Sequence, residues 1–428
     1  MFFVNAIDGN KGPIGRGMMN GNIVFIALGN DQKSNTGDFD SMNAFVIAHE
    51  VGHNLGLKHV IKDPNILDSL PNIQGDGDFK DRIDPKYSLT DFQINEIYNS
   101  PLVHSRVSFL SKNDASIAIL DESFEPYFSN LQVKEISTFV QEKAPLNIDS
   151  ARVFAKRKFS SAVLNFSPDE KEVLSFVVNK TNKWLLDNEI NLMANQPWRF
   201  IKIENWLCGG FAHTRGSYII ISQAYLDRLT IDWNTDMNKE KESRLVTSLG
   251  GLLVHEQMHS LQRTFKSKFH RLYSKNWNFI RYKVKDENEI TIDQVSNPDA
   301  PIAEWIIPDP KDKKKFYWIR TLITKNADIP VMGRDFIDTA FEINNKNNTY
   351  SVSKVNDTLS SMPLSDLEFY NKSFPVKRGL DHPNEISAYM FSDFFKARYN
   401  SKIPFLNKDP ISNNNSKIFL KWIKSEMK

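Results

Sequence analysis

The chain contains two copies of the pentapeptide His-Glu-x-x-His, at His49–His53 and His255–His259. Two histidines four residues apart lie on one face of a helix, so both imidazoles can bind one Zn²⁺ at about 2 Å. Zinc lowers the pKa of a bound water, and the glutamate between the histidines, Glu50 or Glu256, can accept its proton as the water attacks a carbonyl carbon. The spacing therefore predicts metal-assisted hydrolysis, typically of a peptide bond.

The first motif extends to a third histidine, His59, six residues after His53. A ligand at this spacing cannot lie on the same helix face, so the helix has to end and the chain has to turn back toward the metal. Gly56 can adopt the left-handed backbone conformation that such a turn requires. We therefore expect His49, His53 and His59 to hold one zinc ion, with Glu50 as the general base.

This longer motif resembles that of the metzincin clan of zinc metallopeptidases, over about residues 1–105. In that clan a tight turn with a methionine follows the motif, whereas here residues 59–68 carry Leu67 or Ile66 at the expected place. Only 48 residues precede the motif, so the module is abbreviated at its N-terminus and the chain is expected to begin inside a domain. The resemblance implies a zinc peptidase module in which residues 22–28 pair with the substrate backbone.

The second motif has no third histidine at that spacing, so its third ligand must come from a distant segment. The candidates are four glutamates: Glu287, Glu289, Glu304 and Glu385. We favour Glu385, because Pro383 marks the start of a helix whose apolar stripe would hold this carboxylate in a fixed place. His255, His259 and Glu385 would then form a His₂Glu zinc site, with Glu256 as the general base.

The second site resembles that of the gluzincins, in which two histidines come from one helix and a glutamate comes from another. Residues 209–216, residues 259–263 and the expected Glu385 helix are also similar to uncharacterised bacterial zincin-like proteins. The likeness covers about residues 130–400. It implies a complete zinc peptidase module but no particular substrate.

Other residues in the second half of the chain could take part in catalysis, but no motif identifies them. His213, Tyr218 or Tyr389 could stabilise the negative charge that develops on a scissile carbonyl oxygen, if they line the cleft. For His213 and for His270, however, a structural position inside the fold is the favoured interpretation. Cys208 is the single cysteine, which excludes a disulfide within the chain, and it is expected to be a small buried side chain.

Hydrophobic periodicity predicts the elements that carry these residues. Strands are predicted at residues 2–7, 22–28, 198–203 and 218–222, a glycine-rich loop at 9–17, and helices at 41–55, 91–99, 134–141, 169–186 and 242–265. The last helix is expected to bend at Gly250-Gly251. The predicted fold class is α+β, with two zincin-like modules that each pack an active-site helix on a small mixed sheet, the second module being mostly helical. The modules are placed at residues 1–105 and 129–428, with a linker at residues 106–128.

The composition is that of a folded protein without strong net charge. The 428 residues, of which 40% are hydrophobic, are enough for two or three domains. The 54 Lys and Arg nearly balance the 52 Asp and Glu, which gives no reason to expect nucleic acid or an anionic membrane as a partner. No run of about 18 apolar residues predicts a membrane span. Residues 1–7 lack the basic start and the apolar core of a signal peptide.

The sequence therefore predicts a zinc-dependent metalloendopeptidase with two zinc ions, one per module, and a protein or peptide substrate. Two alternatives stay open: one or both modules could be catalytically inactive, zinc-stabilised binding or scaffolding domains, or could hydrolyse a non-peptide amide. Bacterial enzymes of both resembled types are commonly exported, which predicts a secreted or cell-surface location, with the cytoplasm as the alternative. Specificity and oligomeric state are left open.

Overall fold

The computed structural model describes residues 2–4, 15–17, 24–27, 51–52, 107–233, 237–285, 287–324, 327, 329–346, 349–399 and 413–428. The chain divides into two compact units, Met1–Arg106 and Val107–Lys428. The boundary lies next to residue 105, where the sequence places the end of the first module.

The described residues of the first unit form a three-stranded sheet. β1 (Phe2–Val4) pairs in parallel with β3 (Val24–Ala27), and β2 (Gly15–Gly17) pairs antiparallel with β3. β1 and β3 lie within the two strands predicted here, which are confirmed over these residues. β2 lies in the glycine-rich segment that was expected to be a loop, because glycines suppress the side-chain pattern by which strands are predicted.

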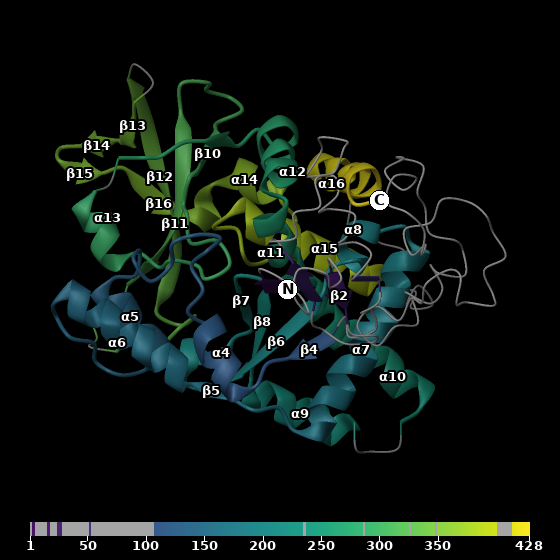
Figure 1. The fold of residues 1–428 in the computed structure, drawn as a ribbon. Coiled ribbons are helices and arrows are strands. Elements are labelled where there is room, and N and C mark those ends of the chain that lie inside the picture. The colour runs from purple at the N-terminus through teal and green to yellow at the C-terminus, as the bar shows by residue number, and fades with distance from the viewer. Residues whose placement is uncertain are drawn as a thin grey trace, which may run out of the picture. The chain divides into compact units, whose positions relative to one another are not determined.

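A mixed sheet is the framework of the second unit (Figure 1). Its strands are β4 (Val107–Phe109), β5 (Val163–Leu164), β6 (Trp198–Ile203), β7 (His213–Arg215) and β8 (Tyr218–Ser222). The order is β4-β6-β8-β7, with β5 also beside β6. β4, β6 and β8 run parallel, whereas β5 and β7 are antiparallel to their neighbours. β6 and β8 confirm two of the predicted strands.

This sheet is buried on both faces, as its parallel strands require. Trp198 of β6 and Ile219 of β8 enter one core, and Ile201 and Ile220 enter another. The second of these cores is closed by α4 (Lys112–Ala118), α5 (Val133–Val140) and α6 (Ile148–Ser161). The first is closed by α7 (Pro168–Asp187), α9 (Gln223–Trp233), α11 (Gly251–Thr264), α15 (Pro383–Tyr399) and α16 (Asn414–Glu426).

Residues 106–128 were expected to be a linker, and the structure corrects this for residues 107–128. They form β4 and α4 and then a turn-rich segment, and Ala115, Ile119, Tyr127 and Phe128 are buried against α5 and α6. Their apolar side chains come in short pieces without helix or strand periodicity, so only the tertiary packing shows that they belong to a core.

A second sheet was not predicted, since this module was expected to be mostly helical. Its antiparallel strands are β9 (Ile280–Arg281), β10 (Trp305–Pro308), β11 (Phe316–Ile323), β12 (Phe336–Lys346), β13 (Thr349–Val352) and β16 (Ser361–Pro363). β14 (Lys354–Val355) and β15 (Thr358–Leu359) pair with each other in a separate sheet. Burial along β11 and β12 does not alternate from residue to residue. The two-residue period that identifies a strand in a sequence is therefore weak here.

The predicted helix at residues 242–265 is confirmed, with an irregularity at the two glycines. α10 (Lys239–Leu245) leads through a π-helical turn, η4 (Val246–Gly250), into α11. Local π-helical turns are frequent at functional sites. A side chain at Gly251 would collide with Lys396 of α15, so glycine at this position allows α15 to approach α11 closely.

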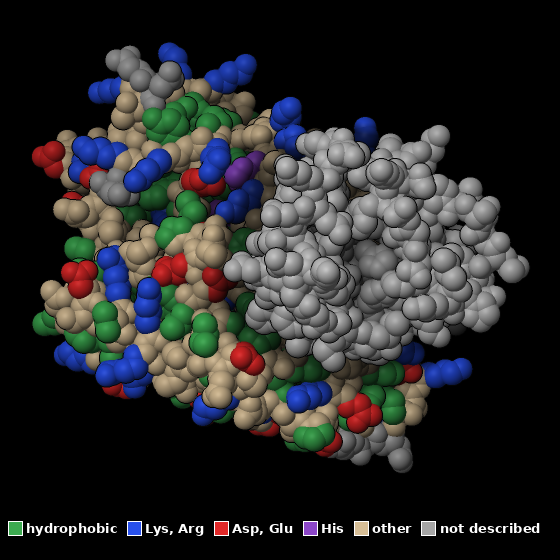
Figure 2. Space-filling model, in the orientation of Figure 1, with side chains coloured by type: hydrophobic (Ala, Val, Ile, Leu, Met, Phe, Trp, Pro, Cys, Tyr) green, Lys and Arg blue, Asp and Glu red, His purple; other side chains and the backbone are tan. Residues whose placement is uncertain are grey.

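The remaining elements are short: η3 (Leu207–Gly210), α8 (Asn191–Ala194), α12 (Lys266–Arg271), η5 (Leu272–Asn276), α13 (Asn288–Asp293), η6 (Leu364–Asp366) and α14 (Glu368–Ser373). Cys208 is buried in η3, as expected. None of the described helices has the length and apolar character needed to cross a bilayer. On the face shown in Figure 2, acidic and basic side chains are interspersed, in keeping with the near balance of charge.

Candidate functional site

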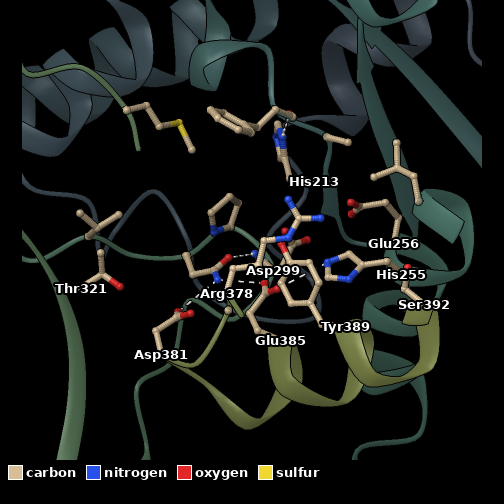
Figure 3. A pocket seen from close by; sticks show the side chains of 18 of the residues that line it. His213, His255, Glu256, Asp299, Thr321, Arg378, Asp381, Glu385, Tyr389 and Ser392 are labelled. Carbon is tan, nitrogen blue, oxygen red and sulfur yellow. Dashed lines mark hydrogen bonds and ion pairs between the residues drawn. The ribbon is translucent and has the colours of Figure 1, made fainter. Parts of the chain in front are cut away.

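His255, His259 and Glu385 come together where α15 packs along α11. Figure 3 shows His255 and Glu385 of this group. Nε2 of His255 lies 3.2 Å from Nε2 of His259. Oε2 of Glu385 lies 3.5 Å from Nε2 of His255, and its Oε1 lies 3.6 Å from Nε2 of His259. In a tetrahedral site with ligands about 2.1 Å from zinc, the ligand atoms are about 3.4 Å apart. The three side chains therefore have the spacing of three corners of such a site, which leaves the fourth corner open.

The protonation of His259 is set by a buried amide. Nε2 of Gln262 donates to the carbonyl oxygen of Asn384 and to Oγ of Ser387, both at 2.9 Å. Its Oε1 therefore faces Nδ1 of His259, 2.8 Å away, and accepts the proton of that nitrogen. Nε2 of His259 is left without a proton, which is the form of imidazole that binds a metal. The same amide ties α11 to the first turn of α15.

Burial sets the charge state of the three donor side chains. Loss of hydration lowers the pKa of His255 to about 4 and lowers the pKa of His259. It also raises the pKa of Glu385, against the effect of the nearby His259 ring. Both imidazoles are therefore neutral at neutral pH, as metal ligation requires.

Glu256 lines a cavity of about 500 Å³, together with His255 and Glu385. Its side chain is 2% exposed, and its Oε2 has no hydrogen-bond partner within the described structure. Burial raises the pKa of Glu256 well above its ordinary value, and the carboxylates of Asp299 and Glu385 raise it further. A carboxyl group with a raised pKa and a free oxygen is suited to accept a proton from a bound molecule.

Glu385 is positioned by residues that the sequence analysis did not identify. Asn297 donates to Glu385 at 2.9 Å and to Asp381 at 3.3 Å. Asp299 accepts hydrogen bonds from the backbone and the hydroxyl of Thr214, and with Glu256 and His259 it forms a second group of possible metal ligands. Asn297 and Asp299 lie in a segment without regular structure and without a motif, so no periodicity could have indicated them.

Arg263 joins three separate segments beneath the site. It is 4% exposed and donates to the hydroxyl of Thr214, to the carbonyl oxygen of Gly216 at 3.3 Å and to that of Pro298 at 2.8 Å. It also forms an ion pair with Glu125. Its position four residues after His259 places it one turn further along α11. That spacing could have indicated its location, but not its partners.

His213 lines the cavity, but its hydrogen bonding does not favour the role of oxyanion donor. Its Nδ1 lies 3.0 Å from the carbonyl oxygen of Phe211 and must donate to it. Its buried Nε2, which has no partner in the part of the chain described, is then unprotonated, since burial lowers the pKa of His213. A neutral imidazole in this tautomer can accept a hydrogen bond at the cavity but cannot donate one.

Of the other aromatic and histidine candidates, only Tyr389 lies at the site. Its ring centroid is 4.2 Å from that of His255, and it lines the cavity. Tyr218 lies in β8 outside the cavity lining. His270 lies in α12 against Trp305, with Glu304 at 3.9 Å, in keeping with a structural role.

The three other glutamates considered as third ligand lie elsewhere. Glu304 forms an ion pair with Arg281 at 2.8 Å, and Glu287 forms one with Lys354 at 3.0 Å. Glu289 is exposed in α13. Among these four glutamates, Glu385 alone is brought to the two histidines.

The first motif lies almost wholly outside the described residues. Val51 and Gly52, which are described, are helical, as the motif requires. The predicted ligands His49, His53 and His59 and the predicted base Glu50 are not described, and their roles stay predictions.

Comparison with protein families, curated proteins and solved structures gives no match for this chain. The resemblances to metzincins and gluzincins therefore rest on the motifs alone, and the function has to be argued from the site.

His382, which precedes α15, predicts a pH dependence of stability. Its Nδ1 accepts from the backbone N–H of Asn384 at 3.0 Å, and its Nε2 lies 3.3 Å from the carbonyl oxygen of Ile302. Burial lowers the pKa of His382 to about 3. Because the unfolded side chain titrates near pH 6.5, its contribution to stability is complete above about pH 6.5 and is lost as the pH falls toward 3.

We expect this one group to reduce the free energy of unfolding by about 2 kcal/mol between pH 7 and pH 5. The variant His382→Asn keeps a side chain that can cap the helix but does not titrate. Denaturant unfolding at both pH values should show a loss about 2 kcal/mol smaller in His382→Asn than in the wild type. Equal losses in both proteins would contradict the neutral, helix-capping role of His382.

Proposed function

We propose that the unit Val107–Lys428 is a zinc-dependent peptidase, with His255, His259 and Glu385 as the zinc ligands and Glu256 as the general base. One observation carries this proposal: the Nε2 atoms of His255 and His259 lie 3.2 Å apart, and each lies 3.5 to 3.6 Å from one oxygen of the Glu385 carboxylate. Beside them, at the wall of a cavity, lies the buried Glu256, whose Oε2 has no partner among the described residues. Two neutral imidazoles and one carboxylate are a donor set that zinc prefers in hydrolytic enzymes.

Each residue of the site has a distinct part in this proposal. Zinc held there would supply Lewis-acid polarisation of a carbonyl and a lowered pKa for water at the open position. Glu256 would accept the proton of the attacking water and return it to the leaving amine. Gln262 and Asn297 would hold His259 and Glu385 in place, and the surrounding cavity would restrict access of bulk water.

The cavity favours an organic substrate over a role of zinc in stability alone. A purely structural zinc site is closed by four protein ligands, whereas here three are brought together at a cavity of about 500 Å³. Apolar side chains line one part of the cavity: Phe139, Phe211, Met332 and Phe336. Peptides offer both the carbonyl that the proposed chemistry needs and side chains that such a surface can bind.

Zinc content and peptide hydrolysis test this proposal on the full chain. Elemental analysis is expected to find one zinc ion fewer per chain in His259→Ala and in Glu385→Ala than in the wild type. Mass spectrometry of a broad peptide library is expected to show cleavage by the wild type and by neither variant. His53→Ala is the matched variant for the first motif, for which we also propose a zinc site, and it should lose the other zinc ion.

The outcomes separate the proposal from its alternatives. Zinc bound at His259 and Glu385 without cleavage of any peptide would identify a zinc-stabilised binding domain or an enzyme for a non-peptide amide. Unchanged zinc content in both His259→Ala and Glu385→Ala would exclude the proposed metal site. Hydrolysis that survives these changes but is lost in His53→Ala would place the activity in the first module.

A further inference from the structure

Two cationic side chains, Arg378 and Lys396, line the same cavity as the proposed zinc ligands. Neither takes part in an ion pair within the residues that the structure describes. Four carboxyl groups also line this cavity, and no ion pair joins any of them to Arg378 or Lys396 within the described residues: Glu256, Asp299, Asp381 and Glu385. Asp393, the nearest acidic neighbour of Lys396 along α15, acts on the charge of both cations, but it forms no ion pair with either among the described residues and does not line the cavity.

One face of α15 connects the cations to the centre. Glu385, Tyr389, Ser392 and Lys396 are spaced by four, three and four residues, so they lie along one side of the helix, and all four line the cavity. With a rise of about 1.5 Å per residue, Lys396 is about 16 Å from Glu385 along the helix axis. Figure 3 shows Glu385, Tyr389 and Ser392 pointing into the cavity from this helix.

Arg378 is held close to the centre by an aromatic stack. Its guanidinium carbon lies 4.8 Å from the ring centroid of Tyr389, whose ring is in turn 4.2 Å from that of His255. Such a cation–π contact positions the guanidinium while leaving its N–H donors free. Figure 3 shows Arg378 beside Tyr389, Asp299 and Glu385.

Lys396 is held at the far end of the same face. Its aliphatic stem packs on Gly251, where α11 has no side chain. Burial lowers the pKa of Lys396, against the effect of the nearby Asp393 carboxylate. A cation in this situation is stabilised by an anionic ligand.

We propose that Arg378 and Lys396 form a cationic subsite that binds a carboxylate of the substrate, so that the site takes acidic peptides. The carboxylate belongs either to an aspartate or glutamate side chain or to the C-terminus. The cleavage of these peptides rests on the proposed function, whereas their binding does not.

Binding to zinc-loaded Glu256→Gln protein tests the cationic subsite without turnover. The probes are dansylated alanine-based octapeptides with Glu or Gln at successive positions, each with a free or an amidated C-terminus. We expect the peptides with a carboxylate in reach to bind about tenfold more tightly than their neutral counterparts, as for one charge-assisted pair. Arg378→Gln and Lys396→Gln, each added to Glu256→Gln, should reduce this preference. Lys377→Gln changes an exposed neighbour that does not line the cavity, and it should keep the preference.

The arms of this experiment identify the source of the carboxylate. A preference that disappears on amidation assigns the C-terminus, and a preference that follows Glu over Gln assigns an acidic side chain. Equal binding of acidic and neutral peptides, or a preference that both Arg378→Gln and Lys396→Gln leave intact, would overturn the cationic subsite. Tight binding of acidic peptides together with no cleavage by the wild type would overturn the proposed function and leave the subsite standing.

Discussion

Replacing Glu256 with Gln is expected to lower the rate of peptide hydrolysis by about 10²- to 10⁴-fold, the usual contribution of a general base. The amide has nearly the same size and shape as the carboxyl group but cannot take a proton from water. Because Glu256 is not among the three proposed ligands, zinc should stay bound. Measurements of kcat/KM and of zinc content on the same preparations check both parts.

The stability of this variant should not fall. Glu256 has a buried oxygen without a partner among the described residues, and burial raises its pKa, so the native state gains little from its charge. Glu242→Gln is the matched control, because Glu242 lies in α10 and pairs with Lys180 at 2.7 Å, outside the cavity lining. It should leave the rate unchanged.

Zinc content decides how a result for Glu256→Gln is interpreted. A near-wild-type rate with zinc bound would exclude Glu256 as the base. Loss of zinc would instead show that Glu256 is a ligand, in the alternative group that it forms with His259 and Asp299. Only loss of turnover with zinc retained supports the proposed assignment.

The helix that carries His255 and His259 and the position of Glu385 could be predicted from the sequence because both depend on local patterns. The spacing of His255 and His259 requires a helix, and Pro383 indicates where the helix of Glu385 begins. The two longest strands of the mixed sheet, β6 and β8, were predictable for the same reason, because aromatic and β-branched residues predominate in them.

The residues that hold the ligands could not be predicted, because their partners are distant in the chain. Gln262 meets Asn384 across 122 positions, and Asn297 meets Glu385 across 88. Such contacts leave no periodic signal in either segment. The second sheet was missed because its strands are short or not amphipathic, and residues 107–128 were misjudged because their packing is entirely tertiary.

Replacing Arg263 with Met is expected to destabilise the second unit by about 3–5 kcal/mol, the usual cost of removing one partner from a buried charged network. The change leaves the carboxylate of Glu125 unpaired, with its side chain only 12% exposed. It also removes the donors to Thr214 and Pro298, the residues beside Asp299, and so loosens the segment that orients Glu385. Denaturant unfolding measures the first effect, and zinc affinity, which should also fall, measures the second.

Arg271→Met is the matched control for this prediction, because it removes the same side chain from the neighbouring helix α12. Arg271 pairs with Glu426 at 3.3 Å, but its side chain is 47% exposed, so its loss should cost less than about 1 kcal/mol. Adding Glu125→Gln to Arg263→Met should restore part of the lost stability, since it removes the charge left unpaired. Equal costs for Arg263→Met and Arg271→Met would show that the buried network contributes no more than a surface ion pair, and that Arg263 does not hold the segment around Asn297.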